Sequence, residues 1–159
     1  MRKKIVYIDM DDTLCDFTGA RDAALKACPE QKFPQAQMDF FRKLKPIGHY
    51  ATHAPRVLSE FGDYDVWILT RPSYLNPLCY TEKRLWVEDH LGLEWCNKLI
   101  LCPDKSLLKG DWLIDDVAWP DFEGKQFMFN HKAQGQNWWD VFKELLPTEK
   151  FEKWAAGEQ

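Results

Sequence analysis

Short apolar runs that end in acidic or hydroxyl residues constrain the fold of this chain more than any other feature of its sequence. The first run, residues 4–8, is β-branched and aromatic with both faces apolar, which is typical of a strand covered by helices on both sides of a parallel sheet. Similar runs recur at residues 64–69, 98–101, 112–114 and 126–129. Helical patterns cover residues 77–91, before a terminating Gly92, and residues 138–146. Strands alternating with helices predict an α/β fold with a Rossmann-like, three-layer parallel sheet.

Polar side chains stand directly after three of these apolar runs. Asp9 follows the first run, Thr70 the second, and the pair Asp115 and Asp116 the fourth. Ligands of parallel sheets bind at the carboxyl ends of the strands, where these side chains should meet. The sequence therefore predicts a polar site at that edge of the sheet.

Residues 17–48 interrupt the alternation of strands and helices. Helical pieces are expected around residues 18–28 and 35–44. We predict that this stretch is a small helical cap inserted after the first strand. Residues 1–16 and 49–159 would then form the α/β core.

Bulk properties narrow the class of partner. The length of 159 residues suits one domain, and the net charge of −4 argues against polymeric nucleic acid, whereas a small phosphorylated ligand needs only a few cations. No apolar stretch approaches membrane-spanning length, and the odd set of five cysteines contains no CxxC pair, so we expect a reduced, cytoplasmic protein away from membranes. Eight tryptophans suggest that some rings line a pocket. The sequence leaves open whether the chain forms a homodimer.

The segment DMDDTL, residues 9–14, places two carboxylates two residues apart beyond a strand end. Asp9 and Asp11 can converge on one site if the chain turns there, so that one attacks while the other handles protons. Acidic residues after a strand can also simply cap a following helix. The pattern DxDxT resembles the first motif of the haloacid dehalogenase-like phosphatases, which implies that Asp9 is a nucleophile and Asp11 a general acid and base.

The same resemblance extends to three later motifs. Thr70 matches the hydroxyl residue that binds phosphoryl oxygens, Lys105 the lysine that pairs with nucleophile and phosphate, and Asp115 with Asp116 the acidic pair that binds magnesium. The resemblance implies a Mg²⁺ ion held by the Asp9 carboxylate, the Asp11 main-chain carbonyl and Asp115. Such a cation would neutralise the equatorial phosphoryl oxygens.

A closer resemblance covers most of the chain. The segments DMDDTLCDF, FFRKLKPIG, ILTRPS, CYTEKRLWVEDHLG and DKSLLKGDWLIDD are similar to the 5′(3′)-deoxyribonucleotidases. This implies magnesium-dependent dephosphorylation of nucleoside monophosphates, with Phe17, Phe40 and Phe41 forming an aromatic slot for the base. The alternative for these rings is packing between cap and core.

Two positions depart from the family pattern and keep other functions open. Arg71 follows the motif-two threonine where a small residue is common, and Val117 stands where the family often has arginine. We hypothesise that Arg71 binds phosphate in place of the missing arginine. A sugar-phosphate phosphatase of the same mechanism and a non-catalytic phosphate-binding module remain alternatives. His49 and His53 have metal-compatible spacing, but we interpret them as solvated or packing residues.

Overall fold

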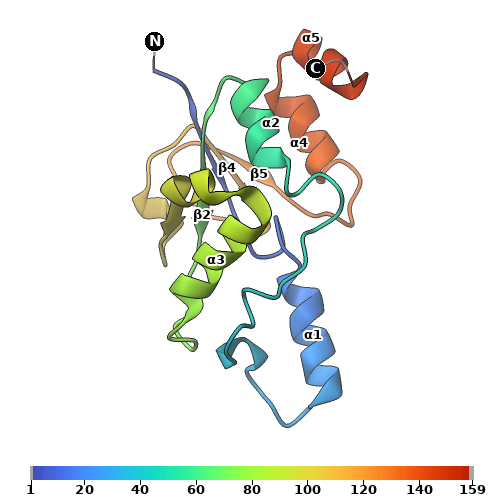
Figure 1. Cartoon of the computed structure of the whole chain (residues 1–159). Coiled ribbons are helices and arrows are strands. Elements are labelled where there is room, and N and C mark those ends of the chain that lie inside the picture. Colours follow the sequence, from blue (N-terminus) through green and yellow to red (C-terminus); the bar gives the residue numbers. More distant parts are fainter. Residues whose placement is uncertain (1, 158–159) are drawn as a thin grey trace.

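The computed structural model describes residues 2–157 and contains a five-stranded sheet (Figure 1). The strands are β1 Ile5–Ile8, β2 Asp65–Thr70, β3 Leu99–Leu101, β4 Trp112–Asp115 and β5 Lys125–Met128. Their order is β3-β2-β1-β4-β5, and every neighbouring pair is parallel. The predicted α/β fold with a parallel sheet is confirmed. Because β1 lies between β2 and β4, residues that follow these three strands meet at one edge.

Five α-helices lie in the described part of the chain. They are α1 Phe17–Ala27, α2 Ala54–Glu60, α3 Cys79–Leu91, α4 Trp138–Leu145 and α5 Thr148–Ala155. Asn137 is the N-cap of α4, and its side chain forms a capping box with Asp140. Gly92, with a φ of +108°, is the C-cap of α3. The sequence patterns predicted α1, α3 and α4, and they missed α2 and α5. No helix among residues 2–157 is long and apolar enough to cross a membrane.

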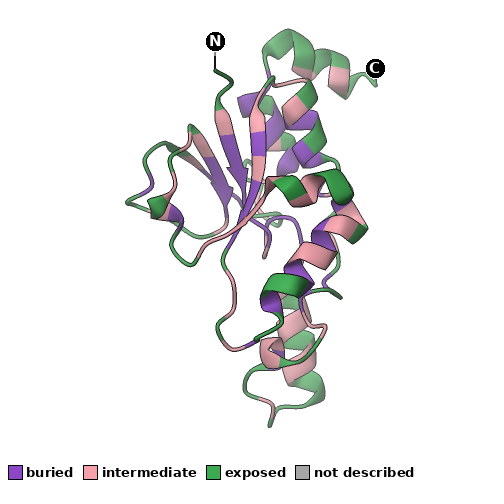
Figure 2. Ribbon diagram, turned by 60° about the vertical axis from the view of Figure 1, so that its left-hand side comes forward, coloured by how far each residue is buried: buried purple, intermediate pink, exposed green. Residues whose placement is uncertain are grey.

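The helices gather on one side of the sheet (Figure 2). Alternate residues of the central strands, including Val6, Ile8 and Ile68, join the main core together with residues of α2, α3 and α4. The opposite face carries a smaller cluster of Tyr7, Leu69, Leu113 and Phe122. Instead of the expected helical layer, that face is covered by the connections at residues 102–111 and 116–124, which contain only the 3-10 turn Lys105–Leu107. These crossovers are too short for a helix of several turns.

Residues 17–48 project beyond the carboxyl end of β1 (Figure 1). Helix α1 forms as predicted, but the helix expected over 35–44 does not, and the segment holds only the 3-10 turn Pro34–Ala36 followed by turns. Asp39 adopts a left-handed φ of +64°, which breaks a right-handed helix. The main-chain N–H groups of Asp39 and Phe41 donate to the carboxylate of Glu82 on α3, at 2.8 and 3.0 Å, instead of to helical carbonyls.

Candidate active site

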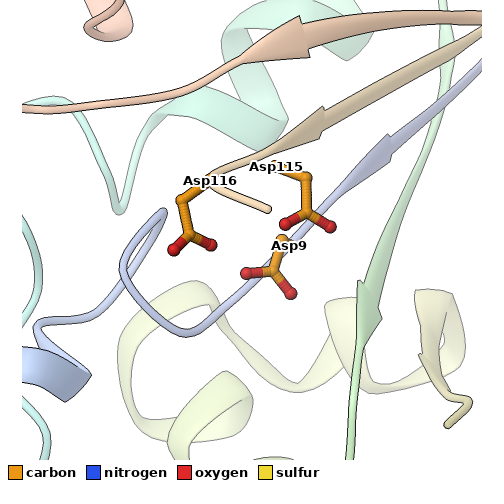
Figure 3. A group of neighbouring side chains, drawn as sticks. All are labelled: Asp9, Asp115 and Asp116. Carbon is orange, nitrogen blue, oxygen red and sulfur yellow. The ribbon is translucent and has the colours of Figure 1, made fainter. Parts of the chain in front are cut away.

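The carboxyl ends of β1 and β4 bring three carboxylates together (Figure 3). One oxygen from each of Asp9, Asp115 and Asp116 lies within 4.8 Å of the others. The main-chain N–H of Asp9 donates to the carbonyl of Ile114 at 2.9 Å, which fixes the end of β1 against β4. Asp9 and Asp115 are buried, with 5% and 1% of their surface exposed. The family resemblance predicts Asp116 as part of the acidic pair but not as a ligand, and the structure adds it to the cluster.

Lys105 bridges two of these carboxylates. Its Nζ donates to Oδ1 of Asp9 and, at 2.6 Å, to Oδ2 of Asp115. Asp104 caps the short 3-10 turn that carries Lys105 by accepting hydrogen bonds from the N–H and hydroxyl of Ser106, at 3.0 and 2.6 Å. Burial alone would lower the pKa of Lys105, but Asp9 and Asp115 raise it above its usual value. The ammonium therefore stays charged between its partners.

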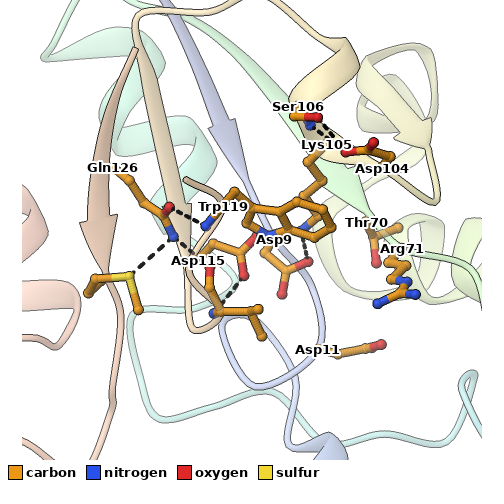
Figure 4. Close-up of polar contacts among 12 residues, drawn as sticks. Asp9, Asp11, Thr70, Arg71, Asp104, Lys105, Ser106, Asp115, Trp119 and Gln126 are labelled. Atoms are coloured by element: carbon orange, nitrogen blue, oxygen red, sulfur yellow. Dashed lines mark hydrogen bonds and ion pairs between the residues drawn. The ribbon is translucent and has the colours of Figure 1, made fainter. Parts of the chain in front are cut away.

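Asp115 has further donors from the loop that follows β4 (Figure 4). The main-chain N–H of Val117 donates to Oδ1 at 2.9 Å, and the indole Nε1–H of Trp119 donates to Oδ2 at 3.0 Å. Gln126 on β5 holds this loop, because it accepts from the N–H of Trp119 at 2.9 Å and donates to the carbonyl of Val117 at 2.6 Å. The sequence contained no signal for Trp119 beyond the general excess of tryptophan.

Lys83 on α3 is a site residue that the sequence reasoning missed. Its ammonium is fully buried and donates to Oδ2 of Asp11 at 2.7 Å, Oγ1 of Thr70 at 2.6 Å and the carbonyl of Arg71 at 2.8 Å. Because the Thr70 oxygen accepts from Lys83, the Thr70 hydroxyl proton is free to be donated to another group. A signal existed, since the helical period puts Lys83 on the same face as the buried Trp86 three residues later.

The carboxylates of the site differ in how firmly they hold protons. Burial raises the pKa of Asp11 above its usual value, although Lys83 opposes the shift. Burial and the nearby Asp9 raise the pKa of Asp115 to about 6. Burial together with Asp9 and Asp115 raises the pKa of Asp116 to about 8. Buried carboxyl groups this close to one another resist ionising together, and a bound divalent cation would favour their ionised forms.

Asp12 links the loop that follows β1 to α1. It has a left-handed φ of +59°. Its carboxylate accepts from the N–H and the hydroxyl of Thr18, at 2.8 and 2.5 Å. This contact fixes the N-terminal end of α1, where Phe17 and Arg21 lie, and both residues line the same hollow as the carboxylates.

A hollow of about 240 Å³ lies over these groups. Its walls are formed by Asp9, Asp11, Asp12, Phe17, Thr18, Arg21, Arg71, Lys105, Asp115, Asp116, Val117 and Trp119. Most predicted site residues therefore converge, with Thr70 buried behind the wall at the end of β2. No carboxylate among residues 2–157 forms an ion pair with the guanidinium of Arg71.

The three predicted slot phenylalanines pack on one another instead of leaving an open slot. Phe41 stacks on Phe17 with ring centroids 6.0 Å apart, and Phe40 meets both rings edge-on. Phe41 is buried, and only Phe17 lines the hollow. Edge-to-face and offset contacts between aromatic rings, together with burial, favour this arrangement.

A larger hollow of about 610 Å³ lies elsewhere, at α2 and Trp154, and its walls include His49 and His53. The His53 ring Nδ1 lies 3.3 Å from the carbonyl of His49. Among the described residues the acidic cluster is the sole group of three close potential metal ligands, so these histidines have no third partner.

Comparisons with known proteins point to one family. The sequence model of the family described as "5′ nucleotidase, deoxy (Pyrimidine), cytosolic type C protein" matches residues 29–135. The chain is 37% identical over 118 residues to a Vibrio phage KVP40 protein assigned to the 5′(3′)-deoxyribonucleotidases, a match that covers 72% of this chain and 66% of that protein. It is 42% identical over 77 residues to the human cytosolic-type 5′(3′)-deoxyribonucleotidase, covering 48% of this chain and 38% of that protein.

The chain thus spans between about a third and two thirds of the length of these relatives. A solved haloacid dehalogenase-like hydrolase from Burkholderia xenovorans shares 15% identity over 72% of this chain and 73% of that chain, with a TM-score of 0.37. That overlap is too small to support an argument, whereas the family match covers more than half of the chain. The chain belongs to the family described as "5′ nucleotidase, deoxy (Pyrimidine), cytosolic type C protein".

Proposed function

We propose that the chain is a magnesium-dependent phosphatase that hydrolyses deoxyribonucleoside monophosphates through an aspartyl phosphate on Asp9. The observation that carries this proposal is the convergence of two buried lysines on the two carboxylates of the DxDxT motif. Lys105 holds Asp9, and Lys83 holds Asp11. A nucleophile, a proton donor and fixed cations are the groups that phosphoryl transfer requires in one place.

The two carboxylates divide the reaction between them. Asp9 attacks phosphorus through one carboxylate oxygen, and the bond from phosphorus to the ester oxygen breaks while Asp11 gives that oxygen a proton. Asp11 then takes a proton from a water molecule, whose oxygen attacks phosphorus and displaces the Asp9 carboxylate. The raised pKa of Asp11 supports this role, because a group that gives up a proton near neutral pH must first hold one.

Three neighbouring groups would hold the phosphoryl oxygens. The Thr70 hydroxyl can donate its proton to a phosphoryl oxygen, because the hydroxyl oxygen already accepts a hydrogen bond from Lys83. Lys105 stays charged beside Asp9, and Arg71 lines the hollow without a carboxylate partner among residues 2–157. Arg71 would thereby supply the positive charge that Val117 lacks.

The acidic cluster fits a magnesium ion. Three carboxylates, each with an oxygen within 4.8 Å of the others, offer the hard oxygen ligands that Mg²⁺ prefers. Burial and the neighbouring carboxylates raise the pKa values of Asp115 and Asp116, and a divalent cation would oppose both effects. Asp9, Asp115 and Asp116 would hold the ion, with the Asp11 main-chain carbonyl as a further ligand. When bound, Mg²⁺ supplies charge neutralisation of the phosphoryl oxygens.

Residues 17–48 would act as the cap over the phosphate site. The contact between Asp12 and Thr18 ties this segment to the catalytic loop, and Phe17 and Arg21 of α1 line the hollow. A deoxynucleotide substrate is supported by the family match and by the activities that the relatives are named for.

Phosphate release from a panel of substrates tests the proposal. Deoxyribonucleoside and ribonucleoside 5′- and 3′-monophosphates, sugar phosphates and an aryl phosphate would be compared with Mg²⁺ and with chelator. We expect magnesium-dependent turnover that favours deoxynucleotides, and none in Asp9→Asn. Turnover without a preference for nucleotides would be consistent with the mechanism but would contradict the nucleotidase assignment. If no substrate is turned over, the alternative of a phosphate-binding module would be favoured.

A further inference from the structure

The carboxylate of Asp115 is held by donors from three places in the chain. Its Oδ2 accepts from the ammonium of Lys105 at 2.6 Å and from the indole Nε1–H of Trp119 at 3.0 Å. Its Oδ1 accepts from the main-chain N–H of Val117 at 2.9 Å. A carboxylate offers roughly four lone-pair sites, so these donors occupy most of them. Because Asp115 is buried, little water can reach it to replace a lost donor, and the protein itself sets the orientation of this carboxylate.

Trp119 is placed in turn by Gln126 on the neighbouring strand β5. The Gln126 side chain accepts from the main-chain N–H of Trp119 at 2.9 Å and donates to the carbonyl of Val117 at 2.6 Å. One side-chain amide thus satisfies a main-chain donor and a main-chain acceptor two residues apart, as an adjacent strand would. Since Asp116 lies between Asp115 and Val117, the amide of Gln126 restrains the segment that carries both carboxylates.

The indole ring of Trp119 also reaches a second group of the site. The ammonium of Lys105 lies 5.8 Å from the ring centroid, and the ring extends across this lysine in Figure 4. An ammonium in this position is attracted by the π electrons of the indole. The edge of the same ring donates to Asp115, which is bound by Lys105 as well. Trp119 therefore contacts both the acidic cluster and the lysine that bridges two of its carboxylates.

We propose that Trp119 and Gln126 are positioning residues that set the affinity of the acidic cluster for its divalent cation. This inference rests on the magnesium site of the proposed function, and it specifies which groups prepare that site. Neither residue touches the ion. Trp119 orients Asp115 through its indole N–H, and Gln126 acts through the loop that follows β4. Removing a group that supports a metal ligand typically lowers metal affinity by about 10-fold to 100-fold.

Calorimetric titration of the substrate-free protein with Mg²⁺ tests this inference without any turnover. Trp119→Phe keeps a ring and removes the indole N–H, while Gln126→Leu removes the amide at a similar size. Each variant should raise the Kd for Mg²⁺ by about 10-fold or more. Because both residues act on one loop, the effect of the double variant should be smaller than the product of the two single effects.

Trp112→Phe is a matched control for the loss of an indole. Trp112 is half-buried on β4, and the ammonium of Lys125 lies 5.4 Å from its ring centroid, so it resembles Trp119 in its surroundings but lies before Asp115 on the strand. Its Kd for Mg²⁺ should stay within about twofold of the wild type.

The dependence of activity on Mg²⁺ provides a second readout. In Trp119→Phe and Gln126→Leu, phosphate release should fall at low Mg²⁺ concentration and return close to the wild-type kcat when Mg²⁺ is raised, because the carboxylates themselves are intact. A residue that served only the stability of the loop would lower the melting temperature of the metal-free protein and leave the Kd for Mg²⁺ unchanged.

Two outcomes would overturn the positioning role. One is a Kd for Mg²⁺ within about twofold of the wild type in both folded variants, and the other is a wild type that binds no Mg²⁺. If the wild type binds Mg²⁺ but releases phosphate from no substrate, the proposed function fails, whereas weaker Mg²⁺ binding by the two variants still supports the positioning role. Turnover by a wild type whose variants keep its Kd supports the proposed function and refutes this inference.

Discussion

Replacing Lys83 by Met tests whether the buried ammonium holds the catalytic half of the site together. Methionine fills most of the volume of the lysine stem but cannot donate to Asp11, Thr70 or the carbonyl of Arg71. Removing one partner of a buried ion pair costs about 3–5 kcal/mol, because the other charge is left uncompensated. We therefore expect the free energy of unfolding at pH 8 to fall by about this amount.

The loss in Lys83→Met should depend on pH. Without the ammonium, the pKa of Asp11, which is already raised in the native protein, rises further above its value in the unfolded chain. A carboxyl group with a raised folded pKa contributes stability that is present at low pH and lost as pH rises. The variant can thus relieve the unpaired charge by binding a proton at pH 5, and the loss should be smaller there than at pH 8.

Denaturant unfolding of the wild type and the variant at both pH values measures this loss. Lys98→Met is a matched control, because Lys98 is half-exposed and bonds Asp65 at 2.6 Å, an ion pair worth about 0.2–1 kcal/mol. In activity, loss of the group that positions Asp11 and Thr70 should lower kcat/KM by about 100-fold. A loss at pH 8 no greater than in the control, or one equal at both pH values, would refute the reasoning.

Three further predictions follow from the metal cluster, the cap segment and a helix cap. Since the pKa values of Asp115 and Asp116 are raised to about 6 and about 8, the metal-free protein should lose stability as pH rises through these values. Mg²⁺ should therefore raise the melting temperature more at pH 8.5 than at pH 5.5. An equal rise in melting temperature at both pH values would contradict this prediction. Glu82→Ala leaves the N–H groups of residues 39 and 41 without their acceptor and should lower the free energy of unfolding by about 2 kcal/mol or more, as measured with denaturant. A loss below about 0.5 kcal/mol would show that these N–H groups find other partners. Asn137→Ala should destabilise the protein by about 1 kcal/mol through loss of the α4 capping box, with activity unchanged.

Much of the architecture could be predicted from the sequence because it depends on local patterns. Strand runs with both faces apolar mark a covered parallel sheet, and all five appear in the structure within a residue or two. The helix expected over 35–44 failed for a non-local reason. Two of its backbone donors, the N–H groups of Asp39 and Phe41, bind Glu82, a residue some forty positions away, and no periodicity within the segment could indicate this.

The sequence by itself determined which chemistry stands at the strand ends, since Asp9, Thr70 and Asp115 each follow a strand and the carboxyl ends of adjacent parallel strands must meet. Only the tertiary structure decided which other side chains reach them. Lys83 reaches Asp11 because of the way α3 is oriented about its own axis. Trp119 reaches Asp115 because Gln126, on the neighbouring strand β5, holds the loop that carries it. The packing of the cap phenylalanines was likewise decided in three dimensions. A strand end is a local feature of the chain, whereas these contacts join elements whose mutual orientation depends on the packing of the whole core.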